Sequence, residues 1–117
     1  MAIDYDDRRF ASVANSSAGD VGAGTRFHYR QQGDVVWGTY EGGEIARGTL
    51  IARVLSDGSL DMRYQHVTRD GAIKSGRCAS QPEILVDGRI RLHERWQWTE
   101  GSDEAGESIV EEVAAHA

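Results

Sequence analysis

Apolar and polar side chains alternate along most of the chain from residue 25 onward, in short stretches separated by glycine-containing turns. Alternation with a period of two is typical of strands that bury one face. The turn signals are Gln32-Gly33-Asp34, Gly42-Gly43, Ser56-Asp57-Gly58, Arg69-Asp70-Gly71 and Asp87-Gly88. Strands are therefore predicted over residues 8–14, 25–31, 35–41, 44–55, 59–68, 72–86, 89–99 and 107–113.

Eight strands in chain order predict an all-β fold, an eight-stranded antiparallel up-and-down barrel. A barrel of this size encloses side chains or one small ligand, and its closure leaves no strand edge exposed. The sixth strand must bend at Pro82, because proline lacks the amide hydrogen that the ladder needs. Residues 107–115 also fit a short helix, so the last element stays open between helix and strand.

The length of each turn decides which residues face the interior, because one residue more or less flips a strand. We take three-residue turns at 32–34, 56–58 and 86–88 and a two-residue turn at Gly42-Gly43. The predicted interior is mostly apolar and collects Phe27, Tyr29, Val35, Trp37, Thr39, Gly48, Leu50, Ala52, Val54, Leu60, Met62, Tyr64, His66, Ile84, Ile90, Leu92, Glu94, Trp96 and Trp98. The outer face is mostly charged and collects Arg26, His28, Arg30, Arg47, Arg53, Asp61, Arg63, Gln65, Arg91, His93, Arg95 and Gln97.

This interior predicts a ligand site among aromatic side chains. Glycine at position 48 leaves space in the row that also holds Tyr29, Trp37 and His66. The candidate ligand-binding residues are Tyr29, Trp37, Tyr64, His66, Glu94, Trp96 and Trp98. The alternative is that the aromatic residues simply fill the core.

Glu94 is the one acidic residue predicted to face the interior. A carboxylate among tryptophans suits a cationic or amide group of a ligand, or acts as an acid with a raised pKa. Alternatively, Glu94 forms an ion pair with Lys74 or Arg77, or lies in water at the mouth of the barrel.

No catalytic, metal-ligating or cofactor-binding residue is assigned. The four histidines lack a spacing typical of metal ligands. Cys78 with His66 and Glu94 would supply a nucleophile, a base and an orienting group, but a buried cysteine usually acts as a small hydrophobe. Gly19–Gly24 opens no helix and carries no Lys-Ser/Thr pair, so it is not a phosphate-binding loop.

The composition indicates one globular domain of 117 residues. We expect a disordered acidic N-terminus at 1–7, a single β-barrel at 8–113 and a frayed tail at 114–117. The net charge of −6 and a pI of about 5.1 argue against nucleic acid as a partner. A single Cys, no leader at Met1 and no apolar run of about 18 residues predict a cytoplasmic protein that does not bind membranes.

Five segments resemble a family of small bacterial proteins with an avidin-like fold, often labelled N-acetylglutamate synthase. They are HYRQQGDVVWGTYEGGEIARGTLIARV (28–54), LDMRYQHV (60–67), GRCASQPEIL (76–85), GRIRLHERWQWTEG (88–101) and GESIVEE (106–112). The resemblance implies a calycin-like or avidin-like barrel with an aromatic ligand pocket, and the label implies acetyl transfer from acetyl-CoA to glutamate. The chain departs from typical acetyltransferases because it has no Arg/Gln-x-x-Gly-x-Gly/Ala run, and no functional residue carries over.

Three functions follow as hypotheses. The first is a non-enzymatic barrel that binds a small apolar or aromatic ligand. The second is an N-acetylglutamate synthase-like acetyltransferase. The third is a structural or oligomerisation barrel with a filled core, possible as a homodimer through an outer face that carries Ile51 and Val67.

Overall fold

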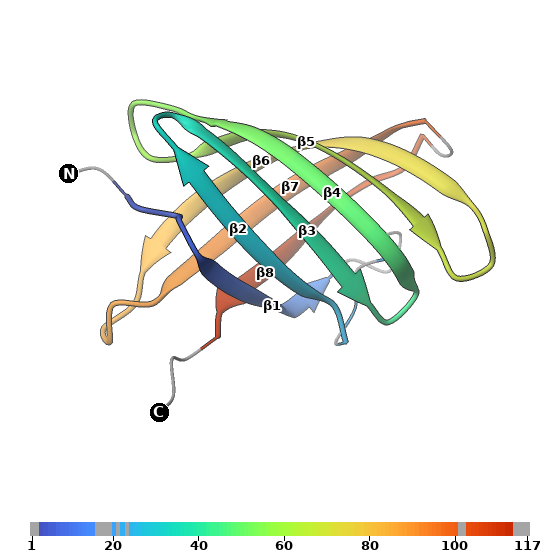
Figure 1. The fold of residues 1–117 in the computed structure, drawn as a ribbon, viewed down its shortest axis with the longest axis horizontal. Coiled ribbons are helices and arrows are strands. Elements are labelled where there is room, and N and C mark those ends of the chain that lie inside the picture. Colours follow the sequence, from blue (N-terminus) through green and yellow to red (C-terminus); the bar gives the residue numbers. More distant parts are fainter. Residues whose placement is uncertain (1–2, 16–19, 21, 23, 101–102, 114–117) are drawn as a thin grey trace.

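The computed structural model describes residues 3–15, 20, 22, 24–100 and 103–113 and shows a closed barrel (Figure 1). Its strands are β1 (Arg8–Asn15), β2 (Arg26–Gln32), β3 (Val35–Gly42), β4 (Ile45–Val54), β5 (Leu60–Thr68), β6 (Ile73–Ile84), β7 (Ile90–Glu100) and β8 (Ala105–Glu112). Each strand runs antiparallel to the next, and β8 pairs with β1 to close the barrel. The all-β barrel is therefore confirmed, and the segment open between helix and strand is β8. The described residues include no helix with the length and hydropathy of a membrane span.

Most of the predicted pairing is confirmed. Gly48 lies opposite His66 in the β4–β5 ladder, and Cys78 lies opposite Trp96 in the β6–β7 ladder. The predicted outer residue Arg53 faces Asp61, an opposite-charge pair across two strands. These registers follow from the three-residue turns after β4 and β6, so β4, β5 and most of β7 bury the face that the sequence predicts. Strand β2 buries its predicted face as well.

Strand β3 buries the opposite face from the one predicted. Its turn from β2 contains two residues, because Gln32 pairs with Val35, and a register shift between Tyr40 and Gly42 interrupts its pairing with β4. Val36 and Tyr40 are therefore buried, and Trp37 is 41% exposed on the outer wall. The exposed face also carries the predicted interior residues Val35 and Thr39. The two changes cancel, which is why the flanking strands keep their predicted faces.

Ile84 is a second correction to the predicted interior. It is 56% exposed, although its register partner Ile90 is buried. Ile84 is the last residue of β6, where the β6–β7 hairpin extends past the end of the barrel (Figure 1). Alternation alone does not show where a strand leaves the core.

One end of the barrel is closed by the segment that precedes β1. Tyr5 is fully buried, its hydroxyl donates to the carbonyl oxygen of Gly58 at 2.6 Å, and the Oε1 atom of Gln31 accepts from its amide at 2.7 Å. The expected disorder therefore does not describe residues 3–7, because the one aromatic residue of this acidic segment is buried in the core. Asp7 also lies 2.9 Å from the Nε2 atom of His28 on β2. Residues 1–2 and 114–117 lie outside the described residues.

The interior is one continuous apolar cluster. Its buried members are Tyr5, Phe10, Phe27, Tyr29, Val36, Tyr40, Ile45, Leu50, Ala52, Leu60, Met62, Cys78, Ile90, Leu92, Trp96, Trp98 and Val110. Polar groups enter this cluster at the end opposite Tyr5 and near the middle of β7, and these two places are the candidate sites.

Candidate functional site

The end of the barrel opposite Tyr5 brings a phenol, an imidazole and an ammonium group together. Tyr40 on β3, Gly48 on β4, His66 on β5 and Lys74 on β6 are successive register partners, so they lie in one row across the sheet. Their side-chain positions share one face, since register partners in a sheet project to the same side. We call this the His66 end.

His66 is hydrogen-bonded on both ring nitrogens. Its Nε2 atom lies 2.9 Å from a carboxylate oxygen of Asp20, and its Nδ1 atom lies 2.9 Å from the Tyr40 hydroxyl. A carboxylate only accepts, so in the neutral ring Nε2 carries the hydrogen and Nδ1 accepts from the Tyr40 hydroxyl. Burial raises the pKa of Tyr40, which keeps that hydroxyl protonated. The array therefore presents one fixed N–H donor to Asp20.

Lys74 supplies a second donor to the same carboxylate. Its Nζ atom lies 3.2 Å from Oδ2 and 3.3 Å from Oδ1 of Asp20. Nζ also lies 5.1 Å from the centre of the Trp98 ring, within the range of a cation–π contact. Asp20 belongs to the connection between β1 and β2, whereas the other members of the site lie on strands.

Trp98 contacts three of the other predicted ligand-binding residues, so four of the seven lie together. Its ring centre lies 5.5 Å from that of Tyr64, 5.3 Å from that of His66 and 5.7 Å from that of Trp96. The predicted space beside Gly48 is absent, because a Cβ atom at this position would lie 2.3 Å from the Tyr40 ring. Tyr40 thus takes the place that the sequence predicts for Trp37.

Two other predicted residues lie elsewhere. Tyr29 is inside but belongs to the opposite half of the core, with its ring 4.7 Å from Phe10 and 6.4 Å from Tyr5. Trp37 lies on the outside of the barrel, because the register of β3 turns its side chain outward. Neither belongs to the His66 end.

Glu94 points its carboxyl group into the middle of the barrel. The hydroxyls of Ser80 and Ser108 donate to it at 2.8 and 3.2 Å, and part of the residue remains accessible from an outer groove between β6 and β8. The expected ion pair is wrong for both cations, since Lys74 binds Asp20 and Arg77 donates to Gln97 at 2.9 Å. Burial, only partly offset by the hydroxyl groups, raises the pKa of Glu94.

Cys78 lies beside the Glu94 carboxyl and not beside His66, the base that the sequence pairs it with. Its sulfur lies 3.6 Å from the Ser80 hydroxyl, and burial, with the Glu94 carboxyl nearby, raises the pKa of the thiol. His66 is engaged by Tyr40 and Asp20 and does not reach it. The structure gives Cys78 the character of a buried hydrophobe. Within the described part of the chain, no group of three His, Cys, Asp or Glu side chains is placed to hold a metal ion.

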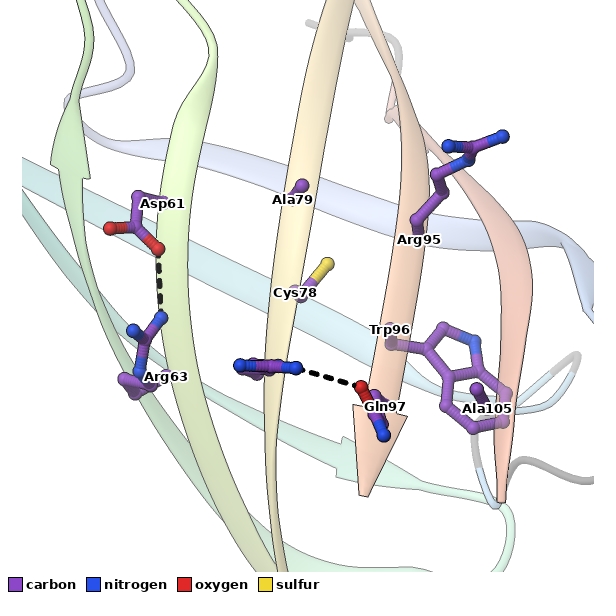
Figure 2. A pocket seen from close by; sticks show the side chains of 9 residues that line it. Asp61, Arg63, Cys78, Ala79, Arg95, Trp96, Gln97 and Ala105 are labelled. Carbon is purple, nitrogen blue, oxygen red and sulfur yellow. Dashed lines mark hydrogen bonds and ion pairs between the residues drawn. The ribbon is translucent and has the colours of Figure 1, made fainter. Parts of the chain in front are cut away.

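The outer wall carries a groove of about 320 Å³ across β5, β6, β7 and β8 (Figure 2). Arg63 donates to Asp61 at 2.7 Å, Arg77 donates to Gln97, and the Trp96 ring extends toward β8. These arginines are largely solvated and already have partners. Such a face contributes to solubility and provides no enclosed cavity.

Three members of the His66 end are absent from the candidate ligand-binding residues: Asp20, Tyr40 and Lys74, of which Lys74 is predicted only as an alternative partner of Glu94. Asp20 is the only acid in the run from residue 15 to 24, among small residues, and that isolation is the one signal that singles it out. Tyr40 is missing because the turn between β2 and β3 contains two residues and not the predicted three.

The chain matches the family described as Avidin-like protein over residues 3–113. It belongs to this avidin-like family. Barrels of the family generally bind small ligands and commonly form oligomers. No curated protein and no solved structure matches the chain. The homodimer predicted from the sequence stays a prediction.

Proposed function

We propose that this avidin-like barrel binds a small molecule at the His66 end and catalyses no reaction. The observation that carries the proposal is the pair of inward-facing donors, His66 Nε2 and Lys74 Nζ, with Trp98 beneath them. Ligand sites combine apolar walls with a few placed polar groups, and the mouth of a barrel is a common location for them.

The other regions of the barrel are poorer candidates. Tyr5 covers the opposite end, and its hydroxyl and amide are both engaged. In the middle, Tyr40 covers Gly48, and Tyr64 covers Gly76, where an added Cβ would lie 2.4 Å from the Tyr64 hydroxyl. A ligand therefore enters from the end where Asp20 and Lys74 remain partly exposed.

A purely structural barrel has no need of these groups. Burying a charged or polar side chain costs free energy unless it is paired, so a filler core favours apolar residues. The packed middle of the barrel suits the filled-core hypothesis. The buried His66 and the inward Lys74 do not, because burying them costs free energy that apolar residues at the same positions would avoid. The His66 end therefore favours binding.

Among the residues that the structure describes, the candidate nucleophiles Tyr40 and Cys78 are poorly suited to catalysis. The Tyr40 hydroxyl is buried with a raised pKa, so it is a poor nucleophile, and the raised pKa of Cys78 has the same effect on its thiol. The acetyl-transfer hypothesis gains no support from the described residues.

The test is a fluorescence titration in a Trp37→Phe background, which leaves Trp96 and Trp98 as the emitting residues. Benzoate, benzamide and benzylamine share one ring and differ in charge, so they serve as probes. We expect a saturable change in emission for at least one probe, weakened by Lys74→Met. No saturable change with any of the three would contradict ligand binding at the His66 end.

A further inference from the structure

We infer that the ligand carries a carboxylate, and that this carboxylate takes the position which the Asp20 side chain holds between His66 and Lys74. The inference rests on the proposed function and adds the chemical class of the ligand. Asp20 in this structure is an internal stand-in for the ligand's acidic group.

The two donors are arranged for one carboxylate. Oδ2 of Asp20 lies 2.9 Å from Nε2 of His66 and 3.2 Å from Nζ of Lys74, and Oδ1 lies 3.3 Å from the same Nζ. These are charge-assisted hydrogen bonds, which are stronger than bonds between neutral groups. A ligand that brings the same two oxygen atoms meets a complete binding site.

The donor set also rejects other ligand chemistries. Tyr40 engages Nδ1 of His66, so the imidazole offers its Nε2–H and nothing that accepts a hydrogen bond from the ligand. The ammonium group of Lys74 only donates and repels a cation. An amine therefore gains no partner from His66 or Lys74 and would have to bind Asp20 itself, and an uncharged amide gains only hydrogen bonds through its oxygen.

Asp20 is separable from the barrel that holds its partners. It comes from the connection between β1 and β2, while His66 and Lys74 are fixed in the β5–β6 ladder as register partners. Its side chain is 18% exposed and that of Lys74 is 21% exposed, so the contacts open toward solvent. Release of Asp20 alone would leave the buried N–H of His66 without an acceptor, but an incoming carboxylate supplies that acceptor while the released Asp20 regains its hydration. A ligand carboxylate therefore competes with Asp20 at a modest cost.

The apolar part of the ligand has a surface beside the donors. Lys74 passes over the Trp98 ring, and Trp98 contacts Tyr64 and His66. The stem of a lysine side chain covers apolar surface while its head group stays polar. Since Trp98 itself is only 4% exposed, the body of a ligand whose carboxylate replaces Asp20 would lie mainly against the Lys74 stem.

The experiment measures benzoate, benzamide and benzylamine affinities by calorimetry for the unsubstituted protein and for Asp20→Asn, Lys74→Met and Asp34→Asn. Asp34 is an exposed acid in the β2–β3 turn at the opposite end, so its variant has the same charge change and serves as the matched control. We expect Asp20→Asn to bind benzoate about fivefold more tightly, since it removes the competing carboxylate. We expect Lys74→Met to bind it about tenfold more weakly. Asp34→Asn should equal the unsubstituted protein.

The outcomes separate this inference from the proposed function. Two results would overturn the carboxylate inference while leaving the proposed ligand site in place. One is tighter binding of benzamide or benzylamine than of benzoate, and the other is an Asp20→Asn protein with no higher affinity for benzoate. If inorganic phosphate displaces benzoate at equal concentration, the site binds anions in general, and the inference of a carboxylate ligand is overturned. Failure of all three probes overturns both. Circular dichroism confirms that each variant is folded, and Asp20→Ala replaces Asp20→Asn if the latter is not.

Discussion

The Tyr40 hydroxyl and the Nδ1 atom of His66 lie 2.9 Å apart inside the barrel, and their hydrogen bond determines which His66 nitrogen donates to Asp20. The bond joins β3 to β5 across β4, where Gly48 leaves room for the Tyr40 ring. Tyr40 thus sets the direction in which His66 presents its N–H group.

Tyr40→Phe removes this hydrogen bond and leaves Nδ1 buried without its partner. We expect the free energy of unfolding to fall by about 1 kcal/mol, the usual net worth of one hydrogen bond. The His66 ring should also lose its single tautomer. Urea unfolding measures the first effect, and nitrogen-15 NMR of the imidazole measures the second. An unchanged NMR spectrum would contradict the orienting role of Tyr40.

Gly48→Ala tests the close approach of Tyr40 to β4. The added Cβ would lie 2.3 Å from the Tyr40 ring, so the ring must move. We expect a loss of about 1–3 kcal/mol in the free energy of unfolding, as for other overpacked sites. Gly22→Ala is the control, because an added Cβ there meets no atom within 4 Å. Equal unfolding midpoints for the two variants would contradict this packing.

Glu94→Gln should stabilise the protein increasingly as pH rises. Burial raises the pKa of Glu94 above that of the unfolded chain, so the folded state binds the proton more tightly. Stability is therefore greatest below the unfolded pKa and falls as pH rises through the folded pKa. Cys78, Ser80 and Ser108 contact this carboxyl, and its charge also acts on Tyr29, Tyr40 and Tyr64. The thiol and the three phenols all have raised pKa values.

The measurement for Glu94 is urea unfolding of both proteins at about pH 4 and about pH 8. The variant should match the unsubstituted protein at the lower pH and exceed it at the higher pH. A constant difference between the two proteins across this range would contradict a raised pKa. The matched control is Glu104→Gln, an exposed acid outside the interior.

Tyr5 closes the end of the barrel opposite His66, and two substitutions separate its ring from its hydroxyl. Tyr5→Phe loses the bond to the Gly58 carbonyl and should cost about 1 kcal/mol of unfolding free energy. Tyr5→Ala also empties a fully buried volume and should cost about 3–5 kcal/mol. Urea unfolding measures both. If Tyr5→Ala were as stable as the unsubstituted protein, Tyr5 would not anchor the N-terminus, and the predicted disorder of residues 1–7 would be supported.

Trp37 provides a check on the corrected register of β3. It is 41% exposed, while Trp96 and Trp98 are 9% and 4% exposed. Acrylamide should therefore quench mainly Trp37, and Trp37→Phe should remove most of the quenching that the unsubstituted protein shows. Strong quenching that persists in Trp37→Phe would show that Trp37 is not the exposed tryptophan, and would contradict the corrected register of β3.

Alternation and turn spacing were sufficient to predict the barrel and most of its registers. They failed on β3 because the segment VVWGTYEG carries apolar residues on both faces. Val35 and Trp37 on one face and Val36 and Tyr40 on the other satisfy the pattern equally well. Glycine-containing turns of two or three residues are both common, so only the ladder itself settles the choice.

The candidate site was predicted in part. Tyr64, His66, Trp96 and Trp98 come together because their strands have the predicted register. Asp20 could not be placed, since a loop residue has no period that fixes its position relative to a strand. Its pairing with His66 and Lys74 depends on the path of the chain between β1 and β2.

The most direct test of the carboxylate site is a crystal structure of the Asp20→Asn protein with benzoate. We expect a benzoate carboxylate with its oxygens at hydrogen-bond distance from Nε2 of His66 and Nζ of Lys74, with its ring toward the open end. An occupied benzoate site elsewhere, with these two nitrogen atoms bound only to protein or water, would contradict a carboxylate ligand at the His66 end.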